Sequence, residues 1–193
     1  MPAGQFLLDK YVAQARQWCW RREWFVQGES MWSLLWKFAH LNQITARETA
    51  QLVIKRTCGK RTSICAKPDV DLRDSSVFDL AVLSDIFRVS GAQAASAFLY
   101  ETLPGSVLRS SEHLRWCQAC MVHGFHSPLF QMKLTRQCPI HERPLIDCCP
   151  GCARPIPFRL TTAYLVKPFH CPHCKLDLAP NMGRIGKTEK IGR

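Results

Sequence analysis

Four pairs of potential metal ligands between Cys117 and Cys174 constrain this chain more than any other feature of its sequence. Two residues separate the ligands within each pair, a spacing that lets one tight turn direct both side chains to the same metal ion. The pairs are Cys117 with Cys120, Cys138 with His141, Cys149 with Cys152, and Cys171 with Cys174. Seventeen residues separate Cys120 from Cys138 and eighteen separate Cys152 from Cys171, which leaves room for a loop or hairpin within each site.

Grouped in sequence order, these pairs predict one site with three cysteines and a histidine and one site with four cysteines. A cross-braced pairing has the same spacing and stays open. Both sets supply four protein ligands, whereas a catalytic zinc keeps one position for water, so we expect two structural Zn²⁺ ions. Cys148 is the one neighbouring residue that could replace a ligand. The surplus histidines at 123, 126, 170 and 173 are expected in packing or at the surface.

Composition points to a globular protein of a reducing compartment. Hydrophobic residues make up 47% of the chain and charged residues 21%. The eleven cysteines are an odd number, and most of them belong to the ligand pairs, which favours metal binding over disulfides. No apolar run is long enough for a membrane span, and the N-terminus lacks a signal pattern. The net charge of +11 favours a polyanionic partner, with a basic surface for solubility as the alternative.

We expect an α+β fold in which a helical half precedes a cysteine-rich half. Residues 1–110 are predicted to hold two helix pairs joined by a linker at 57–75, after an aromatic entry segment at 5–26. Residues 111–180 are predicted to form a tandem zinc-ribbon-like half. Its expected strands are Phe130–Arg136 and Pro144–Ile146, and Leu160–Phe169 is expected to form a hairpin arm. Residues 181–193 are predicted to be a disordered basic tail.

The first helix pair is predicted to be helix-turn-helix-like. Gly28-Glu29-Ser30 opens a helix that runs to about Leu41, and Thr45 with Glu48 forms a capping box for a second helix from Ala46 to about Lys55. This second helix carries polar and basic residues that could contact phosphates or a partner, namely Arg47, Gln51, Lys55 and Arg56, and Lys60 and Arg61 follow it. A solvated basic face explains them equally well.

The second helix pair lacks the residues of a DNA-reading helix. Ser76 and Asp79 mark its start, and Ser90 with Gln93 forms another capping box for a helix to about Glu101. No Lys or Arg lies at 92–101, so we expect this helix to pack in the core or contact protein. The aromatic residues Trp18, Trp20, Trp24 and Phe25 are likewise expected in the core or at a partner, rather than stacked on bases.

The order of these motifs resembles the TniQ family from about Gly28 to Cys174. The resemblance rests on GESMWSLLWKFAHLN, then LRWCQAC, then a segment containing Gln131, CPIH, CPGC and a closing CPHC. The chain departs from the family pattern in two places: the first knuckle is Cys-Gln-Ala-Cys instead of Cys-Pro-x-Cys, and Phe130 replaces a Trp. Neither change removes a ligand.

The resemblance implies a non-enzymatic target-selection adaptor of a DNA transposon, located in the prokaryotic cytosol at the nucleoid. Such a protein couples a mark on double-stranded DNA to an AAA+ ATPase and so to the transposase. Some members read DNA themselves, and others attach to a CRISPR effector with its guide RNA. A sequence-specific transcription regulator with structural zinc is the alternative. A nuclease using His123 or His126 as a base is disfavoured, since the sequence offers no paired carboxylates and no open metal site.

Overall fold

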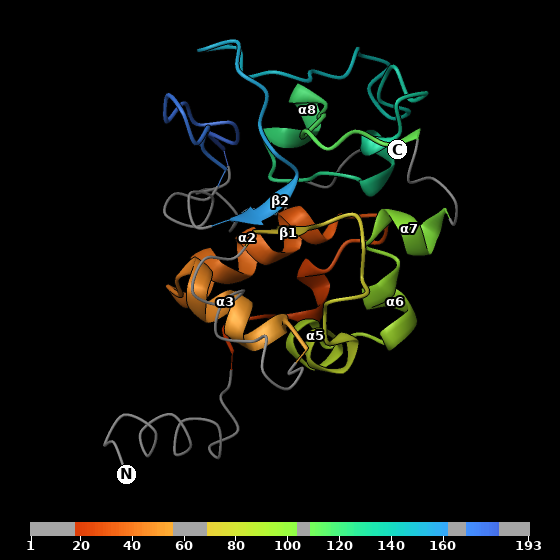
Figure 1. Ribbon diagram of the computed structural model, residues 1–193, viewed down its shortest axis with the longest axis vertical. Coiled ribbons are helices and arrows are strands. Elements are labelled where there is room, and N and C mark those ends of the chain that lie inside the picture. Colours follow the sequence, from red (N-terminus) through yellow and green to blue (C-terminus); the bar gives the residue numbers. More distant parts are fainter. Residues whose placement is uncertain (1–17, 56–68, 104–108, 162–168, 182–193) are drawn as a thin grey trace.

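The computed structural model describes residues 18–55, 69–103, 109–161 and 169–181 (Figure 1). Several predictions fall wholly or partly outside these ranges: the entry segment up to residue 17, the linker up to residue 68, residues 162–168 of the expected arm, and the tail from residue 182. The candidate contact residues Arg56, Lys60 and Arg61 also lie outside the described residues.

Helix α2 (Met31–Asn42) occupies the centre of the fold and is buried on nearly every side. Ser30 caps its start by accepting a hydrogen bond from the Ser33 amide, and Gln43 ends it with a left-handed backbone at φ 53°. Eight of its residues are buried, including Trp32 and Trp36. A helix that is apolar all round must be enclosed by the rest of the protein, and this one is. None of the helices in the described ranges is long and apolar enough to cross a membrane.

Helix α3 (Ala46–Val53) completes the predicted first helix pair. Thr45 and Glu48 form the expected capping box: the Thr45 hydroxyl accepts from the Glu48 amide at 3.2 Å, and the Glu48 carboxylate accepts from the Thr45 amide at 2.8 Å. The helix ends slightly earlier than predicted because Ile54 is extended and pairs with Phe78. The preceding aromatic segment packs as core, as predicted. Short helix η1 (Arg22–Trp24) lies within it, and the Trp20 ring lies 5.0 Å from that of Phe87.

The prediction of the second helix pair is confirmed at its start and is wrong at its end. Helix α5 (Leu80–Phe87) is capped by Asp79, and Ser90 with Gln93 forms the predicted capping box of α6 (Gly91–Ala95). The expected single helix to Glu101 is interrupted, and a separate helix α7 (Leu99–Thr102) follows. The break lets the Ala97 carbonyl accept a hydrogen bond from the Met31 amide at 2.9 Å. This contact supplies a partner for the first amide of α2, a need that the local sequence does not reveal.

A two-stranded antiparallel sheet joins the two halves of the chain. Strand β1 (Asp69–Asp71) pairs with β2 (Arg159–Thr161), with Val70 opposite Leu160. Residues 69–71 therefore form a strand, and the linker prediction is wrong for them. The start of the expected hairpin arm likewise pairs with β1. Arg159 donates to Asp69 at 2.5 Å across this pair. These contacts join residues 90 positions apart, so local sequence pattern could not indicate them.

The strand predicted at Phe130–Arg136 begins instead with the 3-10 helix η3 (Pro128–Gln131). Pro128 occupies the first turn, where its fixed φ favours helix and its missing N–H costs nothing. Ser127 caps this turn, and both Phe130 and Gln131 are buried. At the Pro144–Ile146 segment, the described pairing consists of isolated bridges from Pro144 to Gln137 and from Ile146 to Trp116.

One hydrophobic core runs through both halves. In Figure 1, helices α2, α3, α5 and α6 lie on one side of the β1–β2 pair, and the cysteine-rich half with helix α8 (Gln118–Met121) lies on the other. The Phe169 ring from the cysteine-rich half meets those of Trp32 and Trp36 edge-on, at 5.4 and 5.0 Å. Leu160 from β2 joins the same buried cluster. The described structure is therefore a mixed α+β fold, which confirms the predicted class.

We expect Phe169→Ala to destabilise the whole protein by about 3–5 kcal/mol, since it leaves a cavity beside two tryptophans. Leu134→Ala removes a side chain that is 75% exposed and should change stability by less than about 0.5 kcal/mol. Urea unfolding followed by tryptophan fluorescence measures both. A Phe169→Ala protein whose tryptophan transition matched that of wild type would contradict the shared core.

Candidate metal centres

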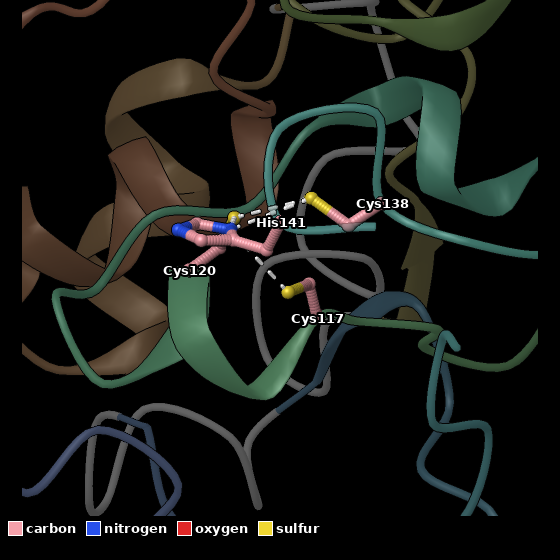
Figure 2. A group of neighbouring side chains, drawn as sticks. All are labelled: Cys117, Cys120, Cys138 and His141. Carbon is pink, nitrogen blue, oxygen red and sulfur yellow. Dashed lines mark hydrogen bonds between the residues drawn. The ribbon is translucent and has the colours of Figure 1, made fainter. Parts of the chain in front are cut away.

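The first ligand group brings together Cys117, Cys120, Cys138 and His141 (Figure 2). Their four ligand atoms lie within 4.8 Å of one another. The Nδ1 atom of His141 lies 3.6 Å from the sulfur of Cys117, 3.3 Å from that of Cys120 and 3.5 Å from that of Cys138. Ligands bound at about 2.0–2.3 Å to one tetrahedral ion lie about 3.3–3.8 Å from each other, so the spacing fits a metal.

The second group brings together Cys149, Cys152, Cys171 and Cys174, again with all ligand atoms within 4.8 Å. The sulfur atoms of Cys149 and Cys174 are 3.5 Å apart, and those of Cys152 and Cys171 are 3.8 Å apart. Both groups join pairs that are neighbours in sequence, so the sequential grouping predicted from the spacing is the one observed. The cross-braced alternative is not observed in the structure. Two four-donor groups could thus hold two metal ions.

Three of the four ligand turns share one backbone pattern. The amide of each leading cysteine donates to the carbonyl five residues later, and the amide four residues later donates back to the carbonyl of that cysteine. Cys138, Cys149 and Cys171 lead these turns, with amide donor distances of 2.9, 2.9 and 2.8 Å. In each turn the residue after the second ligand has a left-handed backbone: Glu142 at φ 51°, Ala153 at φ 56° and Lys175 at φ 64°.

Gly151 shows how closely the chain packs around the second group. A Cβ atom at this position would lie 3.2 Å from Leu176 Cδ2 and 3.4 Å from the sulfur of Cys174. The glycine between Cys149 and Cys152 therefore gives the fourth ligand room to approach. The first ligand pair is built differently: Cys117 caps α8, and Gly124 ends the following turn at φ 68°.

The thiols cannot all ionise without a cation among them. Burial raises the pKa of Cys149 to about 12, and burial together with the nearby Cys117 raises the pKa of Cys120. Others ionise more readily. The backbone amide of Leu176 is the main cause that lowers the pKa of Cys174 to about 7. Burial raises the pKa of the Cys138 thiol, but hydrogen bonds from the backbone amides of its own turn lower the pKa by more, so the net shift is downward. Each group thus contains one thiol whose pKa is lowered and at least one whose pKa is raised, and a bound metal would favour the ionised form of both.

The two groups differ in what surrounds them. Cys149 and Cys171 belong to the main core that contains α2. The cysteines of the first group form a separate small cluster with Phe130. The second group is therefore part of the packing that holds the protein together, whereas the first supports a peripheral lobe.

His126 was expected in packing or at the surface, and it is a packing residue whose partners the sequence did not indicate. It is fully buried, and its Nδ1 lies 2.7 Å from the Ser30 hydroxyl while its Nε2 lies 2.9 Å from the Arg115 carbonyl. The Ser30 amide donates in turn to the His126 carbonyl at 2.7 Å. Burial lowers the pKa of His126 to about 3, so the ring is neutral. His126 therefore ties the start of α2 to the cysteine-rich half and is not placed to act as a solvent-facing base.

Gln131 and Glu29 complete this buried junction. With its amide oriented to satisfy both ends, Gln131 accepts from the Arg115 amide and from His126 Nε2, each at 3.1 Å, and donates to the His113 carbonyl at 2.7 Å. Glu29 is buried and pairs with Lys37 at 2.5 Å, and burial raises its pKa. His126 thus links the Gly28-Glu29-Ser30 motif to Gln131, a connection that no sequence pattern indicated.

Three of the candidate contact residues, Arg47, Gln51 and Lys55, lie within the described ranges. Arg47 is exposed and Gln51 half-buried on α3. Lys55 lies beyond the helix, where its ammonium group donates to the Ser76 carbonyl at 2.8 Å. Cys148 is half-buried and belongs to neither ligand group, so it does not replace a ligand here. His123 is exposed, as expected for a surplus histidine.

No protein-family model matches the chain, and no curated protein matches it.

Changing one ligand in each group should have unequal effects. We expect Cys171→Ser to lose one metal and to unfold the main core, because this cysteine is buried within it. We expect Cys138→Ser to lose one metal while the helical half stays folded. Metal content by elemental analysis and urea unfolding measure these effects. Cys148→Ser, next to a ligand but outside the group, is the control and should keep both metals. Equal destabilisation by the two ligand variants would contradict the different roles.

Replacing His126 should cost stability in a pH-dependent way. Its pKa of about 3 in the folded protein lies well below the ordinary 6.5. The unfolded chain therefore binds a proton first as pH falls, and the stabilisation present above pH 6.5 is lost progressively toward pH 3, by at most about 1.4 kcal/mol per pH unit. We expect His126→Gln to flatten the decline in unfolding free energy between pH 7.5 and 5.5. His123→Gln, an exposed control, should keep the wild-type slope; a wild-type slope in His126→Gln would refute this role.

Proposed function

We propose that the two donor groups bind structural zinc. Seven thiolates and one imidazole form the ligand set of structural zinc sites, and the spacing of about 3.3–3.8 Å matches tetrahedral coordination. Each group already supplies four protein donors, so neither keeps a position for a substrate or an attacking water. When bound, zinc supplies the positive charge that holds four mutually repelling donors together. The ligand turns around it then fix the short segments of the cysteine-rich half as tandem zinc-ribbon-like modules.

We propose that the protein is a non-enzymatic target-selection adaptor of a DNA transposon, which couples a mark on target DNA to an AAA+ ATPase and so to the transposase. The observation that carries this proposal is the packing of the second donor group against the helix pairs through α2. A domain in which closed metal sites and buried helices pack together suits a protein that bridges partners. The motif order that resembles TniQ supplies the identity of those partners, and a CRISPR effector with guide RNA is a further candidate.

The basic composition supports nucleic acid as part of the assembly. The formal charge is +11, and acidic polymers are the partners that such a charge attracts. The transcription-regulator alternative needs a helix that reads bases. Helix α3 presents few polar residues for this role, because Gln51 is half-buried and Lys55 is bound to the 76–77 loop. We therefore favour recognition of a protein–DNA assembly over reading of a short DNA sequence.

Fluorescence anisotropy of a labelled DNA duplex tests this proposal directly. The zinc-loaded protein is added with and without the AAA+ ATPase of the same transposon and ATP. We expect weak, salt-sensitive and sequence-independent binding to DNA alone, and firm binding once the ATPase coats the DNA. His123→Gln, which changes an exposed residue outside both ligand groups, should behave as wild type. Tight binding to one sequence without the ATPase, and no gain with it, would overturn the adaptor proposal in favour of a regulator.

A further inference from the structure

A basic cavity of about 450 Å³ opens on the cysteine-rich half, beside segments that carry ligands of both metal groups. Three segments surround it: the one that leads to Cys117, the residues after η3, and the residues that flank the turn of Cys149 and Cys152. Its lining consists of Ser111, His113, Arg115, Lys133, Asp147, Cys148 and Pro155. None of these residues is a metal ligand, and the adaptor proposal assigns no role to the cavity.

The backbone brings two cations to one side of this segment. Ser110 and Met132 form an antiparallel bridge, flanked by a hydrogen bond from the Lys133 amide to the Arg109 carbonyl at 2.8 Å. Residues opposite each other in such a pair project to the same side. Arg109 therefore lies across from Lys133, and both side chains are exposed. Lys133 reaches the cavity from this position, so Arg109 extends the basic surface beyond its rim.

Arg115 is held in place before any ligand arrives. Its guanidinium donates to the carbonyls of Phe130 at 3.1 Å, of Thr135 at 2.8 Å and of Met132. Every ion pair within the described ranges uses other cations, so neither Arg115 nor Lys133 has a carboxylate within ion-pair distance there. Partial burial lowers the pKa of Arg115, and Asp147 opposes this effect from a longer distance. A half-buried cation without a close counter-ion is stabilised by an anionic ligand.

We infer that this cavity binds a backbone phosphate of nucleic acid, with Lys133 and Arg115 as the recognising cations. Two cations and one carboxylate leave the lining with a single net positive charge when His113 is neutral. A phosphodiester carries one negative charge and so matches this lining better than the dianion of a free phosphate. The large positive charge of the chain brings the polymer to the surface. The inference deepens the adaptor proposal, because it names where the nucleic acid in that assembly is held.

Charge variants measured without the ATPase test the cavity. Anisotropy with a labelled duplex is recorded over a range of salt concentrations. We expect Lys133→Gln to weaken binding about three- to ten-fold and to reduce the slope of log affinity against log salt by about one. Arg88→Gln removes the same charge from an exposed residue that directly follows α5, a helix on the other side of the β1–β2 pair from the cysteine-rich half in Figure 1. This control should change affinity less than about two-fold and keep the slope. Equal effects of the two variants would overturn the inference.

Asp147→Asn supplies a gain of binding, which a misfolded protein cannot produce. Removing the carboxylate should tighten duplex binding about two- to five-fold, since the lining then carries two net positive charges. Unchanged or weaker binding would contradict the inference.

Polyglutamate of matched charge is the competitor that separates phosphate recognition from attraction to any acidic polymer. We expect it to compete at least ten-fold less well than unlabelled duplex. Equal competition would overturn the assignment of phosphate. Failure here leaves the ATPase experiment intact, because an adaptor that uses protein contacts alone would still gain affinity with the ATPase.

Discussion

Mutual repulsion among closely placed thiolates is the constraint on which the cysteine-rich half depends. Each ligand group holds four donor atoms within 4.8 Å, a packing that is stable only around a cation. The surrounding segments offer little else to hold them, because their described pairing consists of the β2 strand and isolated bridges. In the structural-zinc proposal, bound metal substitutes for an extensive sheet or large core, which the described part of these segments does not form. Acid and chelators should act on this half by the same route, since protons and chelators compete for the same thiolates.

Helix α2 connects this metal-dependent half to the rest of the protein. One end of α2 is joined to His126 through Ser30, and its tryptophans pack against Phe169, two residues before the ligand Cys171. The second metal group thus supports the burial of α2, while α3 and α5 cover the other sides. A change at the second group is therefore expected to reach α2 through packed side chains. The adaptor proposal uses this packing, because it fixes the helices against one of the two donor groups.

Local patterns in the sequence predicted the parts of the structure that depend on local chemistry. The capping boxes at Thr45 and Ser90 were predicted because their hydrogen bonds span three residues, and the eight ligands because a metal imposes a fixed spacing. The β1–β2 pair could not be predicted, since its strands are remote in sequence and only three residues long. The junction of His126 with Ser30 joins residues 96 positions apart. The helix break before α7 also has a distant cause, the amide of Met31.

X-ray absorption spectroscopy at the zinc edge would test most directly whether the metal centres are closed and structural. We expect two zinc ions per chain, one bound by three sulfur atoms and one nitrogen and the other bound by four sulfur atoms. Neither ion should have an oxygen donor in its first coordination shell. An oxygen donor at either ion would mean that a water occupies an open position. The proposal of a non-enzymatic adaptor built on closed metal sites would then be contradicted, and hydrolytic chemistry at that ion would become the better explanation.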